Sequence, residues 1–297
     1  MDNKSYTIDQ YTYHAPALEA GLYLVSTPIG NLLDISLRAL AVLAGVDFLA
    51  CEDKRVTSVL LARYGIRQKM LAYHEYNAKT SGSKILSMLH DGRAVALVSD
   101  AGTPLISDPG FKLVEEARQA GVKIIPIPGA SALLAALTSS GVPSNGFFFA
   151  GFLSPKAIAR RARLEELRRL KTTIILYEAP HRVQETLRDL LDIFGPECKV
   201  ALCRELTKRF ETVDQMALKD LAEIYSEKAR IRGEIVLVIG ASPEVEIVDE
   251  IAIDRLLKTL LEQYKPAQAA AQAAKITGLH RKELFQRLLT LKANSKV

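Results

Sequence analysis

The chain has 297 residues, more than the roughly 100 to 200 of a typical domain, so we expect two lobes and an appendage. Apolar residues make up 48% and charged residues 25%, which excludes a mainly disordered chain. Because no apolar run approaches the roughly 20 residues that cross a bilayer, and the polar N-terminus lacks the pattern of a secretory signal, we expect a cytoplasmic protein without a membrane segment.

The net charge of +5 is concentrated in two segments. Residues 250–297 hold nine Lys and Arg against four Asp and Glu, and residues 156–171 hold seven against two. Such segments attract a polyanion, because each phosphate that they neutralise releases counterions. Charge runs on helices are also common as solvated faces, so each segment alone fits a solvent-exposed helix as well as a nucleic-acid contact.

Apolar runs followed by loops rich in glycine, proline and small polar residues recur along the chain. The first is Gly21–Val25, followed by the loop at residues 26–31 and a helix from about Leu32. Similar runs lie at residues 47–50, 94–98, 123–127, 174–177, 200–202 and 234–239. Strands that alternate with helices predict an α/β fold with parallel pairing, in which ligands bind at the carboxyl ends of the strands.

We divide the chain into an N-terminal extension (1–20), a first α/β lobe (21–128), a second α/β lobe (129–243) and a helical tail (250–297). In the tail, an alanine-rich stretch is followed by Thr277-Gly278-Leu279 and a further helix, a pattern typical of a helix-turn-helix. Such a unit either contacts nucleic acid or docks on a dimer partner.

The loops lack the signatures of several common sites. Neither the G-x-G-x-x-G pattern of dinucleotide sites nor the G-x-x-x-x-G-K-[ST] pattern of phosphate-binding loops is present, which disfavours nicotinamide and ATP chemistry. The five histidines show no metal-ligand spacing, and Cys51, Cys198 and Cys203 follow no pattern. We therefore expect no metal site and no thiol redox chemistry.

Five motifs follow one another along the chain: T-P-I-G-N, S-D-A-G-T-P-L-I-S-D-P-G, I-P-I-P-G-A-S-A, Y-E-A-P-H-R and C-R-E-L-T-K. In these motifs the chain resembles the tetrapyrrole methylase superfamily from Gly21 to Gly240, and within it the group that methylates a cytidine 2′-oxygen in the decoding region of 16S ribosomal RNA. The resemblance implies two α/β lobes of the class III methyltransferase type with a cleft between them, and a small C-terminal helical domain. It also implies S-adenosyl-L-methionine as cofactor, the small ribosomal subunit as partner, and a homodimer.

The chain departs from the pattern of this family at two places. Lys54 stands where relatives have Thr in E-D-T-R, and Tyr76 and Ala78 stand where they have His and Glu in H-E-H-N-E. Roles assigned to those family residues do not carry over to this chain.

S-adenosylmethionine has no phosphate, so small residues, backbone amides and a carboxylate are expected to hold it. Asp100 follows a strand and can accept hydrogen bonds, Gly233 permits close backbone approach to a ligand, and Ser131 fits a helix N-cap as well as a ligand contact. The family resemblance adds Tyr177, Arg204 and Glu205. The candidates for cofactor binding are Pro28, Ile29, Gly30, Asp100, Ala101, Gly102, Thr103, Pro128, Gly129, Ser131, Ala132, Tyr177, Arg204, Glu205 and Gly233.

Methylation of a ribose hydroxyl also needs a proton acceptor and cations that hold the RNA phosphates. The candidate acceptors are Asp53, Glu178, His181 and Glu205, which the sequence does not rank. The candidate RNA-binding residues are Arg55, Lys156, Arg160, Arg163, Arg182 and Lys208. Lys156, Arg160 and Arg163 fall on one helical stripe, which we expect to be exposed near the cleft.

The sequence therefore predicts an S-adenosylmethionine-dependent methyltransferase of 16S ribosomal RNA. Two alternatives stay open: a sibling methylase that acts on a tetrapyrrole or a protein side chain, and a non-catalytic RNA-binding assembly factor with the same fold. The helical tail and the two basic segments speak against a small macrocycle as substrate.

Overall fold

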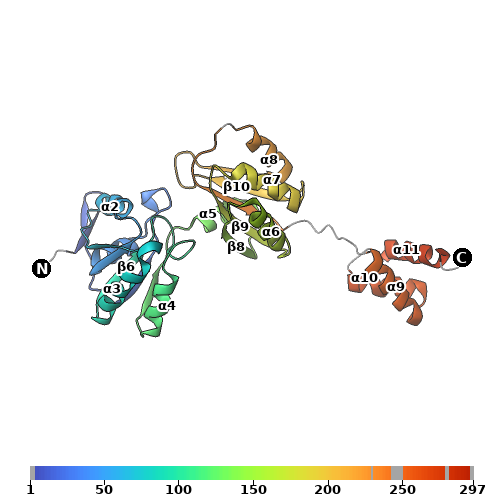
Figure 1. Cartoon of the computed structure of the whole chain (residues 1–297), viewed down its shortest axis with the longest axis horizontal. Coiled ribbons are helices and arrows are strands. Elements are labelled where there is room, and N and C mark those ends of the chain that lie inside the picture. The colour runs from blue at the N-terminus through green and yellow to red at the C-terminus, as the bar shows by residue number, and fades with distance from the viewer. Residues whose placement is uncertain (1–3, 229, 242–249, 278–280, 295–297) are drawn as a thin grey trace. The chain divides into compact units, whose positions relative to one another are not determined.

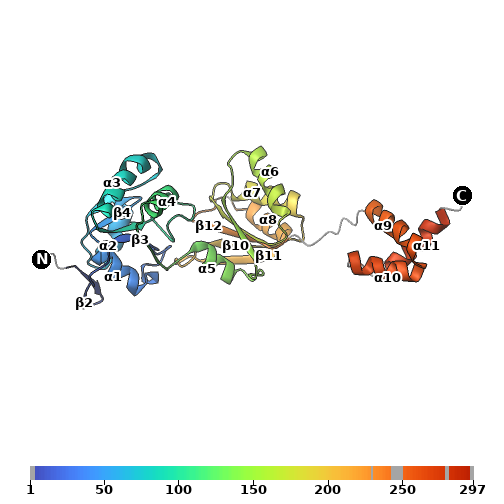
Figure 2. The same ribbon diagram turned by 90° about the horizontal axis from the view of Figure 1, so that it is seen from below.

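The computed structural model describes residues 4–228, 230–241, 250–277 and 281–294 (Figures 1 and 2). Contacts divide the chain into two compact units, Met1–Ser242 and Pro243–Val297. A hairpin of β1 (Ser5–Ile8) and β2 (Tyr11–His14) opens the first unit. None of the helices built by the described residues is long and apolar enough to cross a membrane.

The first lobe contains a five-stranded parallel sheet in the order β5-β4-β6-β3-β7. The strands are β3 (Gly21–Val25), β4 (Phe48–Cys51), β5 (Met70–Ala72), β6 (Ala94–Val98) and β7 (Ile124–Ile127). Side chains of α1 (Leu37–Gly45) and α2 (Lys54–Arg63) pack on one face of the sheet, and those of α3 (Ala78–His90) and α4 (Phe111–Gln119) pack on the other. With both faces covered, the central strand β6 is buried along its whole length, as its continuous apolar run requires.

The helix expected from Leu32 begins later, because a short 3-10 turn, η1 (Leu32–Asp34), comes first. The Asn31 side chain accepts a hydrogen bond from the Leu33 amide and caps this turn, and Ser36 caps α1 in the same way through the Ala39 amide. A similar turn, η2 (Glu75–Asn77), follows β5.

The second lobe contains a five-stranded sheet in the order β11-β10-β12-β9-β8. The strands are β8 (Phe147–Phe152), β9 (Thr173–Glu178), β10 (Lys199–Arg204), β11 (Thr212–Ala217) and β12 (Ile235–Ile239). Only β8 and β9 are parallel, so the prediction of parallel pairing is wrong for this sheet. Because helices cover both of its faces, an antiparallel strand such as β12 is buried as fully as a parallel one and has the same apolar run.

The helices of the second lobe divide between the two faces of this sheet. Helix α5 (Ala132–Ser139) packs on one face, and α6 (Ala157–Arg168), α7 (Val183–Phe194) and α8 (Leu218–Ser226) pack on the other. Since β12 runs antiparallel to β9, its first residue Ile235 pairs with Glu178, the last residue of β9. This register brings the loop after β9 and the loop before β12 to one edge of the sheet.

The second unit consists of three helices, α9 (Glu250–Gln263), α10 (Pro266–Thr277) and α11 (Arg281–Asn294). Buried Ala269, Ala270 and Ala273 of α10 pack against leucines of α9 and α11. The Arg287 guanidinium is paired with Asp254 at 2.6 Å, which ties α11 to α9. The prediction of helices here is confirmed, whereas the expected turn at Gly278 and Leu279 lies outside the described residues.

Candidate active site

The strand-end loops of the two lobes enclose a cavity of about 430 Å³, a volume typical of small-molecule sites. The first lobe contributes the loops after β3, β4 and β6, and the second contributes the start of α5 and the ends of β8, β9 and β12. One side of the cavity is therefore formed at the carboxyl ends of the strands in the first lobe's parallel sheet. Ligands bind at this edge in open α/β sheets.

The floor of the cavity is a set of loops tied together by hydrogen bonds. The amides of Thr27 and Gly102 each donate to the carbonyl of the other, at 2.9 and 3.0 Å. The Thr103 hydroxyl lies 3.1 Å from the Ser26 hydroxyl and donates to the Ala130 carbonyl at 3.2 Å. Gly102 has a φ of +83°, which favours glycine. The loops after β3, β6 and β7 thus form one rigid surface.

Three carboxylates of the first lobe, Glu52, Asp100 and Asp108, line the cavity, and its described lining contains no Lys or Arg. Burial, together with repulsion from Asp100 and Asp108, raises the pKa of Glu52 above its usual range. Burial and the nearby Asp100 also raise the pKa of Asp108, although the Ser99 hydroxyl opposes this shift. Asp100 is anchored by the Asp53 amide, which donates to its Oδ1 at 2.9 Å. A cavity with these walls suits a positively charged ligand.

Glu178 lies on the second-lobe side of the cavity, and both of its carboxylate oxygens already have partners. Its Oε1 accepts from the Ala179 amide and pairs with Arg182, each at 2.7 Å, and its Oε2 accepts from the Thr186 hydroxyl at 2.6 Å. The side chain is 1% exposed. This carboxylate therefore fixes the loop after β9 to the first turns of α7.

Aromatic rings and a hydroxyl complete the second-lobe side. The Tyr177 ring lies edge-on to Phe149 and Phe152, with centroids 4.9 and 5.5 Å away, and burial raises the pKa of its hydroxyl. Ser131 occupies the N-cap position of α5 as expected, but its side chain makes no capping hydrogen bond. Because its hydroxyl is not used for capping, it can face a ligand in the cavity.

Nine of the candidate cofactor-binding residues line the cavity: Ile29, Asp100, Ala101, Gly102, Thr103, Ser131, Ala132, Tyr177 and Gly233. The other six, Pro28, Gly30, Pro128, Gly129, Arg204 and Glu205, are not among its lining residues.

Three glycines among these candidates lie close to other parts of the protein. A Cβ on Gly30 would lie 2.5 Å from the Lys208 side chain, and one on Gly129 would lie 2.9 Å from the Ser26 Cβ. A Cβ on Gly233, whose φ is +93°, would lie 2.4 Å from Glu205. Gly233 thus allows a close approach by Glu205, and it also lines the cavity.

Of the four candidate proton acceptors, only Glu178 lines the cavity. Asp53 caps α2 and binds Arg55, whose hydrogen bonds lower the pKa of this carboxyl to about 2. Glu205 binds Lys208 at 2.9 Å, which lowers the pKa of Glu205. His181 is exposed and lines a neighbouring hollow with Lys228 and Arg232. These contacts favour positioning roles for the three carboxylates.

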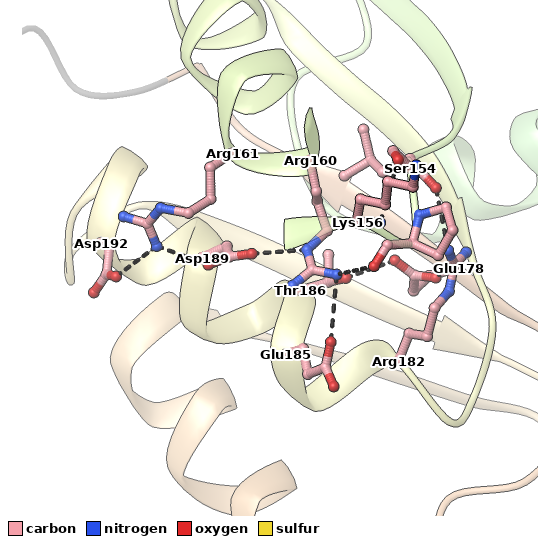
Figure 3. A network of polar contacts seen from close by, with 12 residues as sticks. Ser154, Lys156, Arg160, Arg161, Glu178, Arg182, Glu185, Thr186, Asp189 and Asp192 are labelled. Atoms are coloured by element: carbon pink, nitrogen blue, oxygen red, sulfur yellow. Dashed lines mark hydrogen bonds and ion pairs between the residues drawn. The ribbon is translucent and has the colours of Figure 1, made fainter. Parts of the chain in front are cut away.

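The prediction that Arg160 lies on an exposed stripe is wrong, because its side chain is 4% exposed (Figure 3). Its guanidinium pairs with Asp189 at 2.7 Å and with Glu185 at 3.3 Å, both on α7. Leu164 and Leu167 of α6 are buried, whereas Ala157 and Leu170 are exposed. Arg160 therefore belongs to the face of α6 that packs on α7.

The other candidate RNA-binding cations differ in exposure. Arg182 is 16% exposed and bound to Glu178. Arg163 pairs with Glu166, and Lys208 pairs with Glu205 and Glu234. The Arg55 side chain is 90% exposed although it is bound to Asp53, and Lys156 is exposed at the N-cap of α6. Arg55, Lys156 and Arg163 are thus exposed, whereas Arg160 and Arg182 are not.

The sequence reasoning missed several residues of the cavity wall. Glu52 precedes Asp53 in the E-D-K-R segment, and Asp108 lies at the end of the second motif, in S-D-P-G. Ile106 and Phe152 also line the cavity although both are partly exposed. For Glu52, which directly follows β4, that position was the available signal, because residues after parallel strands lie at the ligand-binding edge. Among the described residues, no group of three or more His, Cys, Asp or Glu side chains is arranged to hold a metal ion.

Comparison with protein families gives two matches. A model described as Tetrapyrrole (Corrin/Porphyrin) Methylases matches residues 21–222, and one described as the RsmI C-terminal HTH domain matches residues 248–292. Together they cover the first lobe, the second lobe as far as residue 222, and most of the helical unit.

Curated relatives cover nearly the whole chain. A protein of Mesorhizobium japonicum named Ribosomal RNA small subunit methyltransferase I is 49% identical, over 97% of this chain and 98% of its own length. Proteins of the same name from Pseudomonas aeruginosa and Vibrio cholerae are 44% and 46% identical, covering 92% and 89% of this chain and 98% and 93% of their own lengths.

Solved structures share the fold of the lobes at lower identity. A cobalt precorrin-4 methyltransferase of cobalamin biosynthesis is 17% identical with a TM-score of 0.57, covering 74% of this chain and 94% of its own. A uroporphyrin-III C-methyltransferase from Thermus thermophilus, complexed with S-adenosyl homocysteine, is 19% identical with a TM-score of 0.53, covering 77% of this chain and 99% of its own.

Proposed function

The chain belongs to the tetrapyrrole methylase family, and we propose that it methylates the 2′-oxygen of a cytidine ribose in 16S ribosomal RNA, with S-adenosylmethionine as the methyl donor. The observation that carries this proposal is the 49% identity, over 97% of the chain, to a protein named as a ribosomal RNA small subunit methyltransferase. The chain is thus a methyltransferase, and its substrate on this proposal lies in the decoding region of the small subunit.

The chemistry of the cavity fits this cofactor. When bound, S-adenosylmethionine supplies a methyl group on a positively charged sulfur. Asp100 would accept hydrogen bonds from its amino or hydroxyl groups, the small residues after β6 permit close approach, and the Tyr177 ring offers an apolar surface. The carboxylates of Glu52 and Asp108 add negative charge without a paired cation among the lining residues.

The residues of the chain contribute mainly by positioning. Attack by a ribose oxygen must be in line with the leaving sulfur, so a rigid floor accelerates transfer by holding the reacting atoms in line. The hydrogen bonds among Ser26, Thr27, Gly102 and Thr103 provide that rigidity before any ligand arrives.

The proton of the ribose hydroxyl needs an acceptor, and the geometry favours Glu52. It lines the cavity, and a carboxylate whose pKa is raised is a stronger base than an ordinary glutamate. Glu178, the only sequence-derived candidate on the lining, already binds Arg182 and Thr186 through both oxygens. Glu52 is therefore our proposed proton acceptor.

Exposed cations would bind the RNA phosphates. Arg55 follows β4 and Lys156 follows β8, so both lie at strand ends close in sequence to the cavity residues Glu52 and Phe152. We assign the helical unit to RNA engagement, because residues 250–297 have a net charge of +5. A homodimer in the cytoplasm is part of the same proposal and follows from the family resemblance.

The alternative tetrapyrrole substrate is less well supported. The solved tetrapyrrole methylases cover only 74% and 77% of this chain, whereas the ribosomal RNA methyltransferases cover 89% to 97%. A substantial part of the chain therefore has counterparts in the RNA enzymes and none in those two macrocycle enzymes.

The proposal is tested by incubating the protein with methyl-labelled S-adenosylmethionine and 16S ribosomal RNA from cells that lack the enzyme. Free RNA and assembled small subunits are the two arms. Nuclease digestion should release the label as 2′-O-methylcytidine from one position in at least one arm. Label on a base, or none in either arm, would contradict the proposal.

A second experiment tests the role of the helical unit. Removal of every residue after Ser242 should leave the affinity for S-adenosylmethionine nearly unchanged, because the cavity lies wholly within the first unit. RNA binding and its dependence on salt concentration should both fall. If the truncated chain instead loses its dimer and keeps its RNA affinity, the helical unit is an assembly element.

A further inference from the structure

Two apolar side chains line the cavity but are also open to solvent. Phe152, at the end of β8, is 57% exposed, and Ile106, in the loop after β6, is 38% exposed. One comes from the second lobe and the other from the first. Exposed apolar side chains that gather at a cavity are typical of a surface that binds a ligand or a partner. Phe152 and Ile106 therefore form an apolar surface at the mouth of the cavity, and the floor beside it carries carboxylates.

The backbone on both sides of this mouth is held in unusual conformations. Leu105 and Ser107, which flank Ile106, have φ values of +72° and +64°, and side chains other than glycine rarely adopt this region. Opposite them, Gly151 has a φ of +65°, and a Cβ added there would lie 3.3 Å from the Ser107 hydroxyl oxygen. Strained backbone of this kind is typical of ligand sites and active sites.

Phe152 is exposed, yet its backbone and ring are well anchored. Tyr177 contacts its ring edge-on, with centroids 5.5 Å apart. The carbonyl of the next residue, Leu153, accepts from the Arg182 guanidinium at 3.2 Å, and the Pro155 carbonyl accepts a longer bond from Arg160 at 3.5 Å. Figure 3 shows these two arginines held in turn by Glu178, Glu185 and Asp189. The buried arginines thus fix the segment that presents the ring.

We propose that the nucleobase of the target nucleotide stacks on Phe152 and contacts Ile106 while its ribose enters the cavity. This inference rests on the proposed function. A nucleotide whose ribose enters the cavity leaves the stacked RNA, and its base then loses its stacking neighbours. A flat aromatic ring at the entrance replaces that lost stacking, as in other proteins that bind unstacked bases. Ile106 closes the opposite side.

The adenine of S-adenosylmethionine is the other base that could lie on this ring. We favour the RNA base, because Phe152 lies at the solvent side whereas Asp100, Ser131 and Gly233 offer polar groups within the cavity. The two assignments differ in which affinity depends on Phe152.

The test uses the full-length protein with substitutions at Phe152 and at a matched control. Phe147 lies on the same strand, is 43% exposed and does not line the cavity, so Phe147→Ala controls for the loss of an exposed ring. Calorimetry measures the affinity for S-adenosylmethionine, and methyl incorporation into the 16S RNA substrate gives kcat and KM. Thermal unfolding checks that each variant is folded.

Phe152→Ala should lower kcat/KM for RNA about ten- to hundred-fold, the effect of one lost base-stacking contact, and should change the affinity for S-adenosylmethionine less than threefold. Phe152→Tyr should restore most of the activity, whereas Phe152→Leu, which is apolar but has no ring, should not. Phe147→Ala should resemble the wild type.

The outcomes separate this inference from the function on which it rests. A wild-type protein that methylates no RNA contradicts the proposed function itself. If the wild type is active and Phe152→Ala is equally active, or if Phe152→Leu restores activity as well as Phe152→Tyr, the stacking role is wrong. A large loss of S-adenosylmethionine affinity in Phe152→Ala would assign the ring to the cofactor instead.

Discussion

Glu52 and Asp108 in the first lobe and Glu178 in the second lie around the same cavity, but their carboxylates have different surroundings. The first two are partly buried near another carboxylate, and their pKa values are raised. Glu178 is almost fully buried and bound by Arg182, Thr186 and a backbone amide. The first-lobe pair thus presents negative charge to the cavity, whereas Glu178 holds the second-lobe wall in place; a further second-lobe carboxylate on the lining, Glu234, is paired with Lys208.

Replacement of Glu178 tests the structural half of this comparison, and we expect the largest effect. Glu178→Ala removes the carboxylate partner of Arg182. The positive charge of the guanidinium then stays partly buried without this carboxylate to balance it. The free energy of unfolding should fall by about 3–5 kcal/mol, as measured by urea denaturation. Glu185→Ala, which removes a 59% exposed partner of Arg160, is the control and should cost less than about 1 kcal/mol. Equal losses of stability in the two variants would show that Glu178 does not fix the loop after β9.

Replacement of Glu52 tests the catalytic half. Glu52→Gln should lower kcat about a hundredfold, the effect of a lost general base, and should leave the protein folded. The wild-type rate should decrease as the pH falls through the pKa of Glu52, which is higher than that of an ordinary glutamate, because the protonated side chain accepts no proton. The measured pH–rate profile of Glu52→Gln should lack this decrease at low pH. A variant with the wild-type profile would exclude Glu52 as acceptor.

Asp100→Ala tests recognition of the cofactor at the floor. Loss of a hydrogen-bond acceptor for the ligand should weaken S-adenosylmethionine binding by about 1–3 kcal/mol. Since Asp100 also accepts from the Asp53 amide, a modest loss of stability is expected, and unfolding curves serve as the control. Unchanged affinity in calorimetry would contradict the assignment of Asp100.

Asp108→Asn tests the cost of an unpaired carboxylate, and its effect should be the smallest. The folded-state pKa of Asp108 is raised by burial, so the ionised form that dominates at neutral pH destabilises the free protein. Asp108→Asn should therefore raise the midpoint of thermal unfolding at pH 7. The gain should disappear as the pH falls below the unfolded-state pKa, where the wild-type carboxyl is protonated in both states. A constant gain at all pH values would point to another cause.

Much of the fold was predictable, because apolar runs and the loops that follow them are local signals. The motifs correctly identified the family, and the strands at Gly21–Val25 and Ala94–Val98 are confirmed. Pairing direction in the second sheet was not predictable, since burial on both faces removes the alternation that marks an antiparallel strand.

The misplacement of Arg160 had a readable signal. Residues 160, 164 and 167 recur at the spacing of one helix face, and Leu164 and Leu167 are both buried. Asp189 lies on the buried face of α7 in the same way. Two opposite charges on two apolar faces predict a buried pair, but only the packing of α6 on α7 shows that they meet. The sequence contains no comparable pattern that points to Phe152 and Ile106, because their role depends on the approach of two lobes.

The most direct test of this account is a crystal structure of the protein with S-adenosyl homocysteine. The ligand should lie in the cavity, and one of the ligand's N–H or O–H groups should lie within hydrogen-bond distance of the Asp100 carboxylate. Glu178 should remain bound to Arg182 and Thr186. A ligand bound outside the cavity, or a Glu178 carboxylate that leaves Arg182 to contact it, would contradict the division of roles between the two lobes.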